Sequence, residues 1–150
     1  MQKSSFYNLV ERAKKREQGS VNFYTHCAKR AKDPLTKDFF FDLVEEEKRH
    51  VKNLEHVRFS KVKRFSEHKI EDLKLSDFLV EMKMDDNMTL QDAMIFAIKL
   101  EQHAADFYAK LADATDDPDA KKIFNSFQEE EIKHKKSLEE AYEDSAYQFF

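Results

Sequence analysis

Hydrophobic residues recur three and four positions apart in four long segments of this chain, with charged residues between them. Such spacing places the hydrophobic side chains on one face of an α-helix. It predicts helices over about residues 5–32, 34–62, 89–115 and 118–143. One glycine and two prolines among 150 residues leave little material for hairpin turns, which also favours helices over sheets. The predicted fold class is therefore all-α.

The chain contains an internal repeat with a constant offset of 84 residues and no gaps. Residues 5–55 align with residues 89–139, and 18 of these 51 positions are identical. Asp33-Pro34 in the first repeat matches Asp117-Pro118 in the second. In each pair the aspartate suits the cap and the proline suits the first turn of a new helix. Each repeat therefore predicts an antiparallel helical hairpin.

The segment between the repeats, about residues 63–88, mixes hydrophobic residues with charges and does not resemble a flexible Gly/Ser linker. A helix of about 26 residues is about 39 Å long. A connection of this length can return along the bundle and leave the second and third helices parallel. We expect one domain over residues 1–150, a four-helix bundle with a long crossover. Ser5 and Thr89 are the predicted caps of the first and third helices.

The hydrophobic face of each predicted helix is interrupted near its middle by ionisable residues. The first helix of each repeat carries one glutamate there, and the second helix carries a Glu-x-x-His motif. The six residues are Glu17, Glu47, His50, Glu101, Glu131 and His134. Four neighbouring acids fall off this face, and we expect them to lie in solvent: Glu45, Glu46, Glu129 and Glu130.

Four carboxylates inside a bundle repel one another, and burying even one unpaired charge costs at least several kcal/mol. Protonation, salt bridges or metal cations can compensate. No Lys or Arg lies at the level of these carboxylates, unless Arg16 or a neighbour bends inward. Two divalent cations would neutralise them, and oxygen ligands with one imidazole per ion suit iron or manganese better than a structural zinc site. An unmetallated polar core is the alternative interpretation.

With this pattern, the chain resembles the rubrerythrin-like branch of the ferritin-like di-iron carboxylate superfamily. In that superfamily a Glu from each of two helices joins a Glu-x-x-His from each of the other two. The resemblance implies a ferritin-like bundle and two iron ions, with manganese or zinc as substitutes. It also implies two terminal ligand pairs and two bridging glutamates: Glu17 with His50, Glu101 with His134, and Glu47 and Glu131 as the bridges.

The chain departs from rubrerythrin itself in two respects. Rubrerythrin has a rubredoxin domain with four cysteines, whereas this sequence has only Cys27. We therefore expect a separate electron donor, such as a rubredoxin or a flavoprotein. Rubrerythrin also has an extra carboxylate one turn after the third-helix ligand, where this chain has Ala104, with Ser20 at the matching place in the first repeat. The resemblance implies a symmetric di-iron site and leaves peroxidase activity of the rubrerythrin type open.

Two adjacent iron(II) ions can supply the two electrons that reduce hydrogen peroxide or dioxygen, so the leading hypothesis is a non-haem di-iron oxidoreductase. The alternatives are a di-iron oxygenase, an iron storage or sensing protein with little turnover, and a purely structural bundle. Tyr24 and Tyr108 lie seven residues after the terminal glutamates Glu17 and Glu101. They are candidates either for hydrogen bonds to the ligand carboxylates or for simple core aromatics.

Composition narrows the expected partners and location. A net charge of −4 without a basic block disfavours nucleic acid. No apolar run approaches the roughly 20 residues that cross a bilayer, so we do not expect a membrane among the partners of this chain. A single cysteine excludes an internal disulfide and favours a reducing, cytoplasmic setting. Phe39, Phe40 and Phe41 cannot all face one bundle interior, which favours a homodimer.

Overall fold

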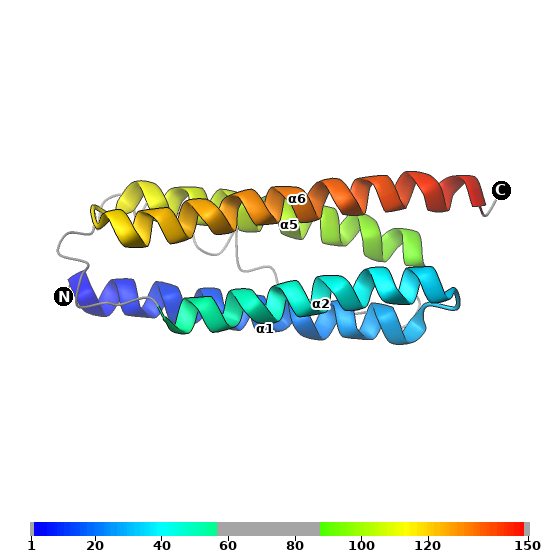
Figure 1. The fold of residues 1–150 in the computed structure, drawn as a ribbon, viewed down its shortest axis with the longest axis horizontal. Coiled ribbons are helices and arrows are strands. Elements are labelled where there is room, and N and C mark those ends of the chain that lie inside the picture. Colours follow the sequence, from blue (N-terminus) through cyan, green and yellow to red (C-terminus); the bar gives the residue numbers. More distant parts are fainter. Residues whose placement is uncertain (1, 57–87, 149–150) are drawn as a thin grey trace.

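The computed structural model describes residues 2–56 and 88–148, and these residues form a bundle of four helices (Figure 1). The helices are α1 (Gln2–Arg30), α2 (Pro34–Glu55), α5 (Leu90–Ala114) and α6 (Pro118–Gln148). The two described ranges contain no β-strand. The all-α prediction is confirmed.

The two repeats form two antiparallel hairpins, α1 with α2 and α5 with α6 (Figure 1). Figure 1 also shows that α2 and α5 run in the same direction along the bundle. This is the ferritin-like order predicted from the length of the segment between the repeats. Most of that segment, residues 63–87, lies outside the described residues.

The helices begin at the local sequence signals that predicted them. Thr89 and Asp92 form a capping box at the start of α5: the Asp92 N–H donates to Thr89 Oγ1 at 3.0 Å, and the Thr89 N–H donates to Asp92 Oδ2 at 3.3 Å. Asp117 Oδ2 accepts a hydrogen bond from the Ala120 N–H at 2.9 Å in the first turn of α6. Asp33 caps α2 by accepting a hydrogen bond from the Leu35 N–H. These caps satisfy N–H groups that have no partner within the helix.

Two helices extend beyond their predicted ends. Helix α1 begins at Gln2, ahead of the predicted cap Ser5, because no proline or glycine among residues 2–5 interrupts it. Helix α6 continues to Gln148 for the same reason. Helix α2 ends at Glu55 with His56 as its C-cap, and the remaining predicted extension to residue 62 falls outside the described residues.

The buried hydrophobic residues form two clusters on either side of a polar centre. Each cluster combines side chains from all four helices, and α1 faces α5 across the bundle, where the Phe23 and Phe96 ring centroids are 5.5 Å apart. The first cluster includes Val10, Leu54, Leu111 and Phe124. The second includes Cys27, Phe40, Met94 and Leu138. The polar centre is therefore enclosed by apolar packing along the bundle axis.

The three adjacent phenylalanines of α2 point in different directions, as the sequence predicted. Phe40 is fully buried, Phe39 packs at the edge of the core, and Phe41 is 44% exposed. The homodimer remains a prediction.

None of the helices in the described part of the chain has a stretch long and apolar enough to span a lipid bilayer.

Candidate metal centre

All six sequence-predicted residues lie together at the middle of the bundle, and none is more than 5% exposed. They form two groups, and within each group the ligand atoms lie within 4.8 Å of one another. The Glu17 group contains Glu17, Glu47, His50 and Glu131. The Glu101 group contains Glu47, Glu101, Glu131 and His134. Two glutamates, Glu47 and Glu131, belong to both groups, so the two groups are adjacent.

Helix geometry brings these side chains to one place. On α2, Glu47 and His50 are three residues apart and share the buried face. The second repeat places the corresponding pair on α6. The terminal glutamates Glu17 on α1 and Glu101 on α5 reach the centre from the helices opposite. Each group therefore draws its ligand atoms from three of the four helices.

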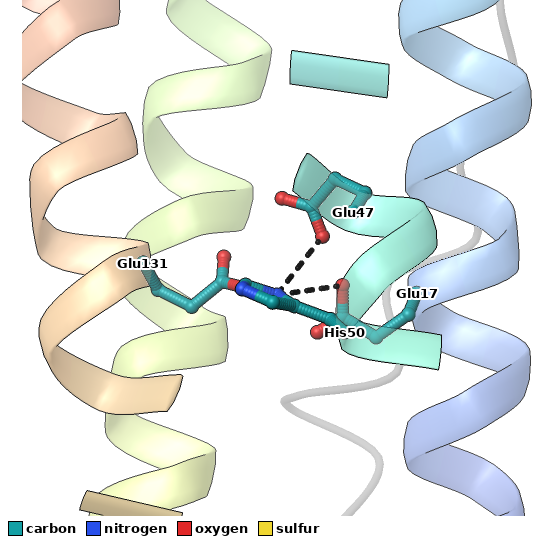
Figure 2. Close-up of side chains that lie close together, drawn as sticks. All are labelled: Glu17, Glu47, His50 and Glu131. Atoms are coloured by element: carbon teal, nitrogen blue, oxygen red, sulfur yellow. Dashed lines mark ion pairs between the residues drawn. The ribbon is translucent and has the colours of Figure 1, made fainter. Parts of the chain in front are cut away.

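In the Glu17 group, one imidazole nitrogen faces three carboxylates (Figure 2). His50 Nδ1 lies 2.8 Å from Glu131 Oε1, 3.5 Å from Glu47 Oε2 and 3.7 Å from Glu17 Oε2. Figure 2 shows these side chains converging from α1, α2 and α6. The arrangement offers one nitrogen and several oxygens to a common point.

The Glu101 group repeats this arrangement with the second histidine. His134 Nδ1 lies 2.9 Å from Glu47 Oε1, 3.6 Å from Glu101 Oε2 and 4.0 Å from Glu131 Oε2. The two imidazole rings stack with centroids 5.6 Å apart. The internal symmetry of the sequence therefore extends to the positions of the ligand side chains.

Several of these buried atoms have no hydrogen-bond partner among the described residues. They are Oε2 of Glu17, Glu47 and Glu101, both carboxylate oxygens of Glu131, and Nδ1 of His50. The short contact from His50 Nδ1 to Glu131 is not aligned as a hydrogen bond. Buried polar atoms without partners are costly and rare. Carboxylate oxygens and imidazole nitrogens are ligands of iron and manganese, so the donor set fits two divalent cations.

In the metal-free protein, bound protons neutralise part of the negative charge of the buried glutamates. Burial, together with the charges of Glu17 and Glu101, raises the pKa of Glu47 to about 8. Burial and the neighbouring carboxylates also raise the pKa of Glu131. Burial acts in the same direction on Glu17, but its interactions with the neighbouring Glu47, His50 and Arg16 side chains outweigh burial and lower the pKa of Glu17. The shared glutamates therefore hold protons where two cations would otherwise supply positive charge.

Comparison with protein families agrees with this site. A family model described as rubrerythrin matches residues 8–142, which include all six residues and both repeats except residues 5–7. The chain belongs to the rubrerythrin family. No curated protein and no solved structure matches it. The family and the buried carboxylate–histidine cluster together support a metal-binding site of the di-iron type.

Within this rubrerythrin-family bundle, the place of the extra carboxylate of rubrerythrin is filled by small residues. Ala104 lies one turn after Glu101 on α5, and Ser20 lies at the matching place on α1. Both are buried. The two groups thus have no additional carboxylate ligand at either position, as the sequence predicted.

Two tyrosines link the repeats through the terminal glutamates. The Tyr24 hydroxyl donates to Glu101 Oε1 at 2.6 Å, and the Tyr108 hydroxyl donates to Glu17 Oε1 at 2.6 Å. Each tyrosine reaches the glutamate of the other repeat because α1 packs antiparallel against α5. The sequence left open whether these residues contact carboxylates or only fill the core. The structure shows both, since each ring is also fully buried.

Removing the two hydroxyls should weaken metal binding. The Tyr24→Phe, Tyr108→Phe variant leaves Glu17 and Glu101 free to turn away, and we expect about 10- to 100-fold lower affinity for Mn²⁺. Titration followed by the electron paramagnetic resonance (EPR) signal of free Mn²⁺ measures this. Tyr142→Phe is the control, because Tyr142 lies about 12 Å along α6 from His134. An unchanged affinity in the double variant would show that the hydrogen bonds do not position the ligands.

Two acids expected in solvent contact the histidines instead. His50 Nε2 pairs with Glu130 on α6, and His134 Nε2 pairs with Glu46 on α2. Both carboxylates remain partly exposed, at 45% and 41%. The prediction of solvent exposure therefore holds in part, but it missed these contacts, because each acid lies at the contact between α2 and α6 although it is off the buried face of its own helix. A carboxylate on the second ring nitrogen orients a ligating imidazole.

The sequence left open whether Arg16 turns toward the buried carboxylates. Its side chain bends inward, and the residue is only 8% exposed. Nη2 donates to the Leu100 carbonyl oxygen at 2.6 Å, and Nη1 lies 3.7 Å from Glu17 Oε1. One guanidinium thus accompanies the four carboxylates, which leaves most of their charge to be balanced by protons, histidines or cations.

Proposed function

We propose that this chain binds two iron ions in the Glu17 and Glu101 groups and reduces hydrogen peroxide or dioxygen there. The observation that supports the proposal is the sharing of Glu47 and Glu131 by both groups. Shared carboxylates place two cations side by side. Reduction of hydrogen peroxide to two waters takes two electrons and two protons, and a pair of iron(II) ions supplies the two electrons when bound.

The chain contributes ligands, orientation and a dry environment. In this proposal His50 and His134 each present Nδ1 to one ion, while Glu130 and Glu46 hold their Nε2 atoms. The tyrosine hydroxyls keep the terminal glutamates turned inward. The two hydrophobic clusters limit the access of water to the centre, which keeps the electrostatic interactions of the ligands strong.

The proposal extends to partners. Electrons would return from a separate donor protein such as a rubredoxin or a flavoprotein, in a reducing, cytoplasmic setting. We also propose a homodimer, for which the half-exposed Phe41 is a candidate contact.

The decisive experiment is anaerobic loading with iron(II), metal quantification, and mixing with hydrogen peroxide or dioxygen in a stopped-flow absorbance instrument. We expect about two irons per chain and their oxidation by about one equivalent of peroxide. The His50→Ala, His134→Ala variant is the control and should bind little iron. Bound iron that neither oxidant oxidises would instead indicate storage or sensing. Oxygen uptake that requires an organic substrate would indicate an oxygenase.

A further inference from the structure

Arg16 breaks the symmetry of the metal centre. Its position in the first repeat corresponds to Leu100 in the second, and Leu100 is a buried hydrophobic residue. The Arg16 guanidinium reaches across to the carbonyl oxygen of this same Leu100, at 2.6 Å. Its other terminal nitrogen, Nη1, is buried, lies 3.7 Å from Glu17 Oε1 and has no hydrogen-bond partner among the described residues.

The surroundings of the two terminal glutamates otherwise match. Glu17 and Glu101 each accept one tyrosine hydrogen bond of 2.6 Å. Each also lies close to one histidine Nδ1, at 3.7 Å from His50 and 3.6 Å from His134. Among the buried side chains of the described residues, the guanidinium beside Glu17 is therefore the one charge that the Glu101 group lacks.

We propose that Arg16 makes the two cation sites unequal, so that the Glu101 group binds a divalent cation more tightly and fills first. A fixed positive charge beside Glu17 repels a cation and offsets part of the negative charge of its ligands. Arg16 and Glu17 are both buried, so solvent screens the repulsion between the guanidinium and a cation only weakly. Arginine stays charged throughout the working range of pH. The inference rests on the two-cation site of the proposed function, but not on its redox chemistry.

Single-site variants measure the two groups separately. His50→Ala removes the histidine of the Glu17 group, and His134→Ala makes the equivalent change in the Glu101 group. Mn²⁺ is the probe because its free form is counted by EPR and no oxidant is needed. We expect His50→Ala protein to bind its first Mn²⁺ at least about tenfold more tightly than His134→Ala protein.

A second pair of variants tests whether Arg16 causes the difference. Arg16→Leu installs the residue that the second repeat carries, and in this background the two affinities should agree within about twofold. Arg16→Lys retains the charge and should retain the difference. Arg16→Gln, neutral and polar, replaces Arg16→Leu if circular dichroism shows that the latter does not fold.

The outcomes separate this inference from the proposed function. Equal affinities of the two single-site variants, or a difference that survives loss of the charge at position 16, would overturn the role of Arg16 and leave the metal site standing. Absence of Mn²⁺ binding in the parent protein would overturn the metal site and the inference together. Metal binding with the expected inequality supports the inference even if peroxide and dioxygen leave the iron form unchanged.

Discussion

Loading with Mn²⁺ or iron(II) should raise the midpoint of thermal unfolding by about 15–30 °C. Each ion at about a thousand times its dissociation constant adds about 4 kcal/mol to the free energy of unfolding. For a chain of this length, about 1 kcal/mol shifts the midpoint by roughly 2–4 °C. The physical cause is that the cations neutralise four buried carboxyl groups, which without metal either repel one another or hold protons at raised pKa: Glu17, Glu47, Glu101 and Glu131. Calorimetry with Mn²⁺ and with a chelator measures the shift.

The thermal midpoint of the metal-free protein and the increment added by metal should change with pH in opposite directions. In the metal-free protein, burial and the nearby carboxylates raise the pKa of Glu47 to about 8. Burial lowers the pKa of His134, but its interactions with the Glu101 and Glu47 carboxylates outweigh burial and raise the pKa to about 11. A raised pKa adds stability that is present at low pH and lost as pH rises. The thermal midpoint of the metal-free protein should therefore decrease as the pH rises from about 5 to about 9. Over the same range the increment from metal should grow, because fewer protons compete with the cations for the ligands.

A metal-free midpoint that rises over this pH range would contradict these pKa directions. A shift below about 3 °C on saturation with Mn²⁺ would contradict the coupling between metal binding and folding.

Replacing the two shared glutamates should remove both ions at once. Glu47 and Glu131 belong to both ligand groups, so Glu47→Gln, Glu131→Gln deprives each cation of two carboxylates. We expect bound Mn²⁺ to fall from about two ions to fewer than about 0.2 per chain at a concentration that saturates the parent. Metal analysis after equilibrium dialysis measures this content.

The same variant should be at least as stable as the parent when both lack metal. Glutamine keeps the size of glutamate and removes two of the four buried carboxyl groups, whose mutual repulsion and burial raise the pKa of Glu47 and of Glu131. The matched control is Glu45→Gln, Glu129→Gln, a pair of exposed acids at equivalent places in the two repeats. The control should retain both its metal content and its stability. Unchanged metal content in the Glu47→Gln, Glu131→Gln variant would exclude the proposed site.

The fold and the six central residues were accessible from the sequence because their signals are local. A hydrophobic spacing of three and four residues predicts a helix and its buried face together. A glutamate or histidine on that face, such as Glu47 or His50, must then point inward wherever the helix packs. The repeat strengthened the prediction, since it places equivalent residues on two helical hairpins that pack against each other.

The tertiary structure alone decided which side chains meet across helices. Tyr24 bonds to Glu101 rather than to Glu17, because the antiparallel packing of α1 against α5 sets the register between them. Glu130 reaches His50 because α2 and α6 are in contact, although on its own helix it lies off the buried face.

The Arg16 side chain shows most clearly the difference between what the sequence determines and what only the tertiary structure decides. The sequence by itself determined that four carboxylates and two histidines share the interior of a helical bundle, because helix periodicity depends only on neighbouring residues. It could not determine whether the long side chain of Arg16 extends to solvent or turns inward. That choice depends on the Leu100 carbonyl and the Glu17 carboxylate, which come within reach only when the helices pack.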